Sequence, residues 1–217
     1  MAKFLYHTEL LERRSLSADT FEADFSRPSG FDFTAGQRIR LVHGALDRDY
    51  SLANAPGDAA LTLCIRRVTA GRLSPLLSSV PVGSAFAFSG PHGYFVFRPS
   101  ARPAVFVATG TGIAPFAAMA RSGVEGFTLL HGVRQAGECY YAALLRARAR
   151  RYVACLSQKG PSGTGTFRGR VTDYLAAHLE PGPYDFYLCG RGDMVRDATW
   201  IVDERFAGSM VYSEIYY

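Results

Sequence analysis

The sequence predicts an antiparallel β-barrel over residues 1–98, followed by a doubly wound parallel α/β domain over residues 99–217. Two observations predict this fold. The first half contains short alternating or β-branched runs separated by Gly, Pro, Asp and Ser, which is typical of a barrel or sandwich. The second half opens with a continuous apolar run at residues 104–108 and then alternates strand-like and helix-like segments, which indicates a parallel sheet buried on both faces.

In the first half the patterns predict one short helix and six strands. The helix begins near Ser74, with Ser74 as N-cap and Pro75 at the first helical position, and runs to about Ser79. The strands are expected at residues 3–9, 20–26, 37–43, 50–53, 60–68 and 84–89.

The change of pattern occurs at residues 97–103, where two prolines and two arginines between apolar runs are typical of a linker. Beyond it, strands and helices alternate as in a doubly wound fold. The strands are expected at residues 104–108, 127–131, 152–157, 185–189 and 210–215, and the helices at 115–122, 141–151, 171–179 and 193–206.

Composition is that of a globular protein, with 48% apolar and 20% charged residues among 217. No apolar run approaches the roughly 18 residues of a membrane helix, so we expect no membrane insertion. The first residues lack the pattern of a signal peptide, which favours a cytoplasmic location. The four cysteines form no C-x-x-C pair, so we expect free thiols and no metal or iron–sulfur centre. A monomer is the default expectation.

The net charge of +5 is divided evenly between the two halves. No basic tail or stripe interleaved with aromatic residues is present, which argues against nucleic-acid binding. Because a basic surface speeds the encounter with an acidic molecule, an acidic protein partner is expected.

Residues 48–54, with the sequence RDYSLAN, follow a strand-like run. Alternate side chains of a strand face opposite ways, so Arg48 and Tyr50 share one face and Ser51 lies on the other. A cation, an aromatic ring and a small hydroxyl together suit a flat anionic cofactor. The alternative is a strand with an exposed tyrosine and a solvated arginine.

Gly110-Thr111-Gly112 follows a buried strand and opens a helix. Glycine lets the backbone approach a pyrophosphate closely, although Pro115 stands where a third glycine of a dinucleotide motif would fall. An ordinary strand–helix turn is the alternative. Cys189 ends a later strand, and a buried cysteine that acts as a small apolar residue is its plain interpretation.

Five stretches, in this order, resemble the ferredoxin–NADP reductase family over nearly the whole chain. They are RDYSLAN at 48–54, CIRR at 64–67 with GRLS at 71–74, GTGIAP at 110–115, CGRGDMV at 189–195 and SEIYY at 213–217. The resemblance implies that the barrel binds flavin, most simply FAD, and that the α/β domain binds NAD(P). It also implies that hydride moves between NADPH and FAD and that single electrons move between FAD and a separate ferredoxin- or flavodoxin-like protein.

The resemblance implies the following site residues. Arg48 neutralises the flavin pyrophosphate, Tyr50 covers one face of the flavin ring, and the stretch 71–74 presents backbone N–H groups and the Ser74 hydroxyl. The flavin and nucleotide contacts expected in total are Arg48, Asp49, Tyr50, Ser51, Cys64, Ile65, Arg66, Gly71, Arg72, Leu73, Ser74, Gly110, Thr111, Gly112, Arg134, Ser157, Gln158, Arg170, Asp193, Tyr216 and Tyr217.

NADP is favoured over NAD because an arginine, Arg134, stands where an NAD-selective fold often has an acidic residue. By resemblance Arg134 and Arg170 match two of three arginines in bacterial NADP-using relatives. Gln158 replaces the third, and Lys159 beside it is a possible substitute.

At the reacting centre the resemblance implies Ser51, Cys189, Glu214 and Tyr216. The Cys189 thiol packs against nicotinamide and does not act as a nucleophile, while Ser51 and Glu214 hydrogen-bond at the same centre. Tyr216 or Tyr217 stacks on the flavin and must be displaced by nicotinamide, so that the tail acts as a gate.

Three alternatives remain at this point. A flavin reductase would release reduced flavin as a product, and an aromatic lid argues against it. An NADH-using reductase component of an oxygenase would keep the same residues. A non-catalytic binding subunit would have no need of Ser51, Cys189 and Glu214 together.

Overall fold

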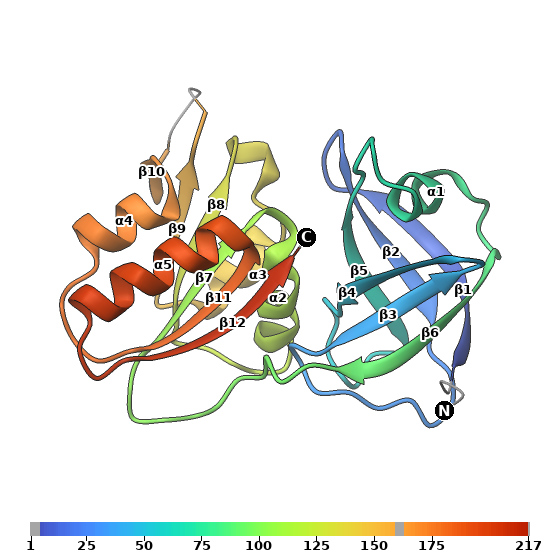
Figure 1. The fold of residues 1–217 in the computed structure, drawn as a ribbon, viewed down its shortest axis with the longest axis horizontal. Helices are drawn as coiled ribbons and strands as arrows, with labels where there is room; N and C mark the ends of the chain where they lie inside the picture. The colour runs from blue at the N-terminus through green and yellow to red at the C-terminus, as the bar shows by residue number, and fades with distance from the viewer. Residues whose placement is uncertain (1–4, 159–162, 217) are drawn as a thin grey trace. The chain divides into compact units, whose positions relative to one another are not determined.

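The structure is a computed structural model that describes residues 5–158 and 163–216. It divides into two compact units, Met1–Val96 and Phe97–Tyr217. The first contains a six-stranded antiparallel sheet and the second a parallel six-stranded sheet with helices on both faces (Figure 1). This confirms the fold class expected from the sequence. Among the described residues, no helix combines the length and apolar character needed to cross a membrane.

The antiparallel sheet of the first unit has the strand order β4-β3-β6-β1-β2-β5. Its two end strands approach each other, because Leu52, just beyond β4, forms a bridge with Leu63 of β5. The sheet is thereby closed into a barrel. The elements are β1 Tyr6–Ser15, β2 Thr20–Ser26, β3 Arg38–His43, β4 Leu46–Ser51, β5 Ala60–Arg66, α1 Leu73–Ser79 and β6 Ala85–His92.

Alternating residues of these strands fill the barrel interior. The largest are aromatic: Phe88 lies edge-on to Phe31, with ring centroids 4.9 Å apart, and is stacked with Tyr6 at 5.2 Å. Leu77 of α1 is fully buried against this core. This packing fixes α1 on the barrel and so sets the position of Arg72, the residue just before the helix.

Three details of the first unit differ clearly from the sequence prediction. Strand β1 continues to Ser15, beyond the expected end at residue 9. Strand β4 begins at Leu46, earlier than the expected residue 50, because residues 47–49 pair with β3 although they are all charged. Helix α1 begins at Leu73, so Ser74 lies inside the first turn and is no N-cap. Its hydroxyl instead accepts the N–H of Val68 at 3.1 Å and closes the preceding loop.

The parallel sheet of the second unit has the order β10-β9-β8-β7-β11-β12. Strand β10 was not predicted, because three residues after a glycine-rich loop carry no clear alternation. The elements are β7 Ala104–Thr109, α2 Ala114–Arg121, β8 Thr128–Val133, α3 Ala142–Arg148, β9 Arg151–Leu156, β10 Thr166–Arg168, α4 Val171–His178, β11 Asp185–Arg191, α5 Gly192–Arg205 and β12 Met210–Tyr216, with 3₁₀ turns at Gly110–Ile113 and Ala136–Glu138.

Both faces of this sheet are covered (Figure 1). On one face Val107 and Leu188 pack with residues of α4 and α5, including Leu175 and Ala198. On the other face Phe106 of β7 stacks on Phe116 of α2, with ring centroids 4.6 Å apart. The carboxyl ends of the parallel strands lie at one edge of the sheet, which is where ligands bind in folds of this kind.

Candidate functional site

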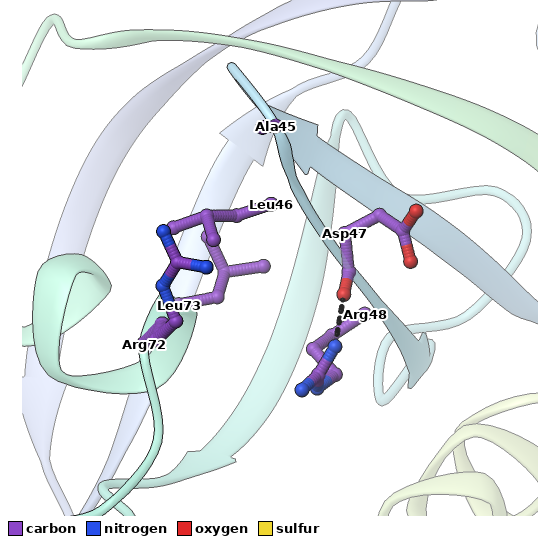
Figure 2. Close-up of a pocket in the computed structure, with 6 residues that line it drawn as sticks. All are labelled: Ala45, Leu46, Asp47, Arg48, Arg72 and Leu73. Atoms are coloured by element: carbon purple, nitrogen blue, oxygen red, sulfur yellow. Dashed lines mark hydrogen bonds between the residues drawn. The ribbon is translucent and has the colours of Figure 1, made fainter.

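A small open pocket lies in the first unit between the start of β4 and the start of α1 (Figure 2). Its volume is about 180 Å³, and it is lined by Ala45, Leu46, Asp47, Arg48, Arg72 and Leu73. Arg48 and Arg72 are both exposed, and a guanidine N–H of Arg48 donates to the carbonyl oxygen of Asp47 at 2.7 Å. Two expected site residues far apart in sequence therefore line one cationic pocket.

Other expected residues of the first unit have structural partners. The N–H of Gly71 donates to the carbonyl of Val68 at 2.8 Å, so with Ser74 it closes the loop before α1. Cys64, Ile65 and Leu73 are buried. Arg66 forms an ion pair with Asp19 at 3.3 Å. Among the residues that line the pocket, the side chains of Arg48 and Arg72 carry positive charge.

Asp49 lies on the opposite face of β4 from Arg48. It pairs with Arg40 at 2.6 Å and with Arg38 at 3.2 Å, both on the neighbouring strand β3. The hydrogen bond from Arg40 holds the pKa of Asp49 below its usual value. This carboxylate fixes the register of β3 and β4 and so positions Arg48 and Tyr50.

Tyr50 and Ser51 end strand β4. Tyr50 is half-buried against the barrel core, and burial raises its pKa to about 12, so its phenol is neutral. Ser51 is 4% exposed, and its hydroxyl is buried with no hydrogen-bond partner among the described residues. A buried hydroxyl without a partner is unfavourable, which makes Ser51 Oγ a candidate contact for a bound group.

In the second unit the turn after β7 packs directly on the end of β11. A methyl group added at Gly112 would lie 2.4 Å from the carbonyl oxygen of Cys189. A methyl group at Gly190 would lie 2.1 Å from Thr109 Oγ1, and that hydroxyl accepts the N–H of Arg191 at 3.1 Å. The two expected motifs at 110–112 and 189–195 therefore form one surface, and only glycine permits the approach.

Cys189, Glu214 and Tyr216 lie together on β11 and β12. Cys189 is directly paired with Glu214, and Tyr216 is two residues further along the same face. The Cys189 thiol is fully buried, and burial raises its pKa well above the usual value, although the nearby Tyr216 side chain acts in the opposite sense. The thiol is thus neutral, in keeping with a packing role and not with nucleophilic attack. Tyr217 lies outside the described residues.

The residues expected at a nucleotide phosphate gather where β8, β9 and β10 end. The N–H of Gln158 donates to the carbonyl of Arg134 at 2.9 Å, and the N–H of Ser157 donates to the carbonyl of Val133 at 3.0 Å. The N–H of Gly169, the residue before Arg170, donates to the carbonyl of Leu156 at 3.0 Å. These backbone bonds bring Arg134, Ser157, Gln158 and Arg170 into one corner. Lys159 lies outside the described residues.

Two acidic side chains modify the charge of this edge. Glu138 is buried and accepts hydrogen bonds from the backbone N–H of Arg134 at 3.0 Å and from its Nε at 2.8 Å. Asp193 pairs with Arg191 at 2.8 Å, and the hydrogen bond from Arg191 lowers the pKa of Asp193. Asp193 also accepts the N–H of Met194 in the first turn of α5. Arg134 and Arg191 are therefore oriented and partly neutralised.

Sequence reasoning missed Glu138 and two further residues of this unit, His131 and Tyr152. His131 is fully buried on β8, with Nδ1 3.0 Å from the Tyr152 hydroxyl and Nε2 3.4 Å from the carbonyl oxygen of Gly110. The only signal in the sequence is a single polar residue inside an apolar strand run.

Comparisons with known proteins agree with these features. Residues 7–97 match the family described as oxidoreductase FAD-binding domain, and residues 106–199 match the oxidoreductase NAD-binding domain. Ferredoxin–NADP reductase B of Sorangium cellulosum (strain So ce56) is 35% identical over 216 residues, with 88% of each chain covered. A crystal structure of a ferredoxin NADP⁺ reductase from Neisseria gonorrhoeae with bound FAD and NADP has a TM-score of 0.86 at 22% identity, with each chain fully covered.

A second type of relative is a larger protein. The toluate 1,2-dioxygenase electron transfer component of Pseudomonas putida is 31% identical over 206 residues, but these cover 88% of this chain and 61% of that protein. The match to the Sorangium protein, by contrast, extends over most of both chains. The chain belongs to the ferredoxin–NADP reductase family and is an FAD-dependent oxidoreductase that uses NAD(P)H.

Proposed function

We propose that the chain carries hydride between NADPH and FAD held by the first unit, and single electrons between FAD and a separate ferredoxin- or flavodoxin-like protein. The observation that carries the proposal is the combination, within β4 and the start of α1, of a cationic pocket, a half-buried tyrosine and a buried hydroxyl without a partner. These groups match the pyrophosphate, the ring and the polar edge of a flavin. FAD supplies the ability to take two electrons as hydride and to release them singly.

Within this proposal Arg48 and Arg72 bind the FAD pyrophosphate, and Tyr50 lies against the flavin ring. Ser51 Oγ hydrogen-bonds to the flavin, which satisfies a hydroxyl that has no other partner in the described chain. On the second unit Gly110, Thr111 and Gly112 allow the dinucleotide backbone to approach closely. The neutral Cys189 thiol packs against nicotinamide, while Glu214 and Tyr216 beside it provide a hydrogen-bonding group and a ring.

NADPH is the proposed hydride donor because the corner formed by Arg134, Ser157, Gln158 and Arg170 carries two arginines. Arg170 is exposed, and an arginine can bind a 2′-phosphate through paired N–H groups. Glu138 neutralises part of the charge of Arg134, which limits the preference. The other candidate function is therefore an NADH-using reductase component of an oxygenase, a role that the name of the Pseudomonas relative describes.

The proposed electron partner is an acidic protein. The support is the net charge of +5 and the name of the Sorangium relative. A basic reductase attracts an acidic carrier over a distance of roughly 10 Å at physiological salt.

An anaerobic stopped-flow experiment tests the proposal. The purified protein with FAD is mixed with NADPH and separately with NADH, and bleaching of the flavin band is followed. Faster bleaching with NADPH supports the proposal. Faster bleaching with NADH keeps the enzyme class and favours the oxygenase-reductase role. No bleaching with either nucleotide contradicts the proposed hydride transfer.

Replacing Arg134 with alanine is expected to lower kcat/KM for NADPH by about 10-fold, because a charge-assisted contact to the 2′-phosphate is lost. The value for NADH should stay within about two-fold, since NADH lacks that phosphate. Steady-state kinetics with both nucleotides measures the effect. Arg150→Ala is the matched control, because Arg150 is exposed just before β9, at the opposite edge of the sheet. An equal loss with NADPH and NADH would place Arg134 outside the phosphate site.

Replacing Arg72 with alanine is expected to weaken FAD binding by about 10-fold, because one of the two cations that line the pocket is lost. Fluorescence titration of the flavin-free protein with FAD gives the Kd. Arg205→Ala makes the same change of net charge in the other unit and should leave the Kd unchanged. If both variants bind FAD equally well, the pyrophosphate does not lie in this pocket.

A further inference from the structure

His131 contacts both the Gly-rich turn that follows β7 and a tyrosine on β9, the strand next to its own. The residue is on β8 and is fully buried. Its Nε2 lies 3.4 Å from the carbonyl oxygen of Gly110, and its Nδ1 lies 3.0 Å from the hydroxyl of Tyr152 on β9. Both ring nitrogens of His131 therefore lie within hydrogen-bonding distance of a partner, and Nε2 contacts the first residue of the turn at 110–113.

The direction of both hydrogen bonds follows from the groups involved. Burial lowers the pKa of His131 to about 4, so the ring is neutral and carries one N–H. The carbonyl of Gly110 can only accept, so the proton is on Nε2. Nδ1 is then an acceptor, and the Tyr152 hydroxyl must donate to it. The tyrosine therefore selects the tautomer that donates to Gly110.

Several neighbours hold Tyr152 in place and act on the ring. The guanidinium of Arg146 lies 4.5 Å from the centre of the Tyr152 ring, and Cys139 hydrogen-bonds with its hydroxyl. Burial and Cys139 raise the pKa of Tyr152, while the positive charge of Arg146 acts in the opposite sense; burial dominates, so the hydroxyl keeps its proton. The carboxylate of Glu138 acts on His131 in the opposite sense to burial.

The hydrogen bond from His131 to the Gly110 carbonyl also fixes the direction of the next N–H group, that of Thr111. Gly110 has a left-handed backbone conformation, with φ of +54°, which leaves its peptide without the usual steric guidance of a side chain. In a planar trans peptide the C=O of one residue and the N–H of the next point in opposite directions. Holding the Gly110 carbonyl therefore orients the N–H of Thr111, which is in the first turn of the 3₁₀ segment, where N–H groups lack helical partners.

We propose that His131 and Tyr152 are positioning residues that orient the Gly110–Thr111 peptide toward the pyrophosphate of the bound nicotinamide dinucleotide. This inference rests on the proposed binding of the dinucleotide at the Gly-rich turn. Because the two residues act on nucleotide binding, removing the hydrogen bond between them raises the Kd and KM for the nucleotide. The limiting rate of flavin reduction stays nearly unchanged.

Tyr152→Phe is the test variant, because it removes only the hydroxyl. Tyr174→Phe is its matched control: Tyr174 is also buried, also lies near an arginine at 5.5 Å, and its hydroxyl has no partner among the described residues. Titration of the FAD-loaded protein with NADP⁺, followed by calorimetry, should give a Kd about five-fold higher for Tyr152→Phe and unchanged for Tyr174→Phe. Stopped-flow reduction at saturating NADPH should give similar rates for both.

The tautomer of His131 provides a second readout that needs no nucleotide. The ¹⁵N chemical shifts of the imidazole should show the proton on Nε2 in the wild type, and a mixture of tautomers in Tyr152→Phe. A wild-type proton on Nδ1 would overturn the proposal. So would equal Kd values for wild type and Tyr152→Phe. A wild type with the Nε2 tautomer that fails to bind NADP⁺ would instead overturn the proposed nucleotide site.

Discussion

Replacing Ser51 with alanine is expected to slow the reduction of bound flavin by NADPH about 100-fold, with FAD still bound. Ser51 follows Tyr50 at the end of β4, and its buried hydroxyl has no partner among the described residues. A polar contact that orients the reacting ring is worth roughly two orders of magnitude in rate when it is lost. Stopped-flow measurement at saturating NADPH gives the rate, and the ratio of flavin to protein absorbance gives the occupancy.

The same substitution should not weaken the fold. Removing a buried hydroxyl that lacks a partner relieves a cost of about 1–3 kcal/mol, so the flavin-free Ser51→Ala protein should be at least as stable as the wild type. Ser89→Ala is the control, because the buried Ser89 hydroxyl is 3.0 Å from His92 Nε2. That variant should lose about 1 kcal/mol of unfolding free energy and keep its rate. A Ser51→Ala protein that is less stable but equally fast would show that Ser51 is structural.

The fold could be predicted from the sequence where burial leaves a periodic signal. The fully buried strand β7 appears as a continuous apolar run, and β2 was predicted with its observed bounds. Strand β4 was placed too late because residues 47–49 are all charged and show no apolar alternation. Asp49 forms an ion pair with Arg40 of β3, and such pairing has no local pattern. The short β10 is stabilised by its neighbour β9, which is tertiary information.

The candidate site could be predicted in part. Arg48, Gly112 and Cys189 stand in motifs whose spacing resembles a known family, and the resemblance identified them. The contacts between motifs were not visible, because the approach of Gly112 to Cys189 depends on strand order in the sheet. His131 was missed because its partners come from another strand, β9, and from the 3₁₀ turn after β7.

Replacing Gly112 with alanine is expected to weaken NADP⁺ binding about 50-fold and to lower the free energy of unfolding by about 2 kcal/mol. The added methyl group would lie 2.4 Å from the carbonyl oxygen of Cys189 and 2.8 Å from the Cα of Gly190, well inside van der Waals contact. Both neighbours are backbone of a central strand, which cannot move without breaking its pairing with β7 or β12. The turn must therefore lift away from β11, and its N–H groups leave their positions.

Calorimetric titration with NADP⁺ and denaturant unfolding measure the two effects separately. Gly57→Ala is the control, because a methyl group there meets nothing within 4 Å and the backbone is not left-handed, so both quantities should match the wild type. The two readouts distinguish packing from binding. Lower stability with unchanged affinity would confirm the close contact at Gly112 but place the dinucleotide elsewhere, because a displaced turn could not hold a pyrophosphate with its affinity intact. Unchanged stability and affinity would contradict the contact itself. A loss of both is expected, since one glycine serves both the strand crossing and the bound phosphate.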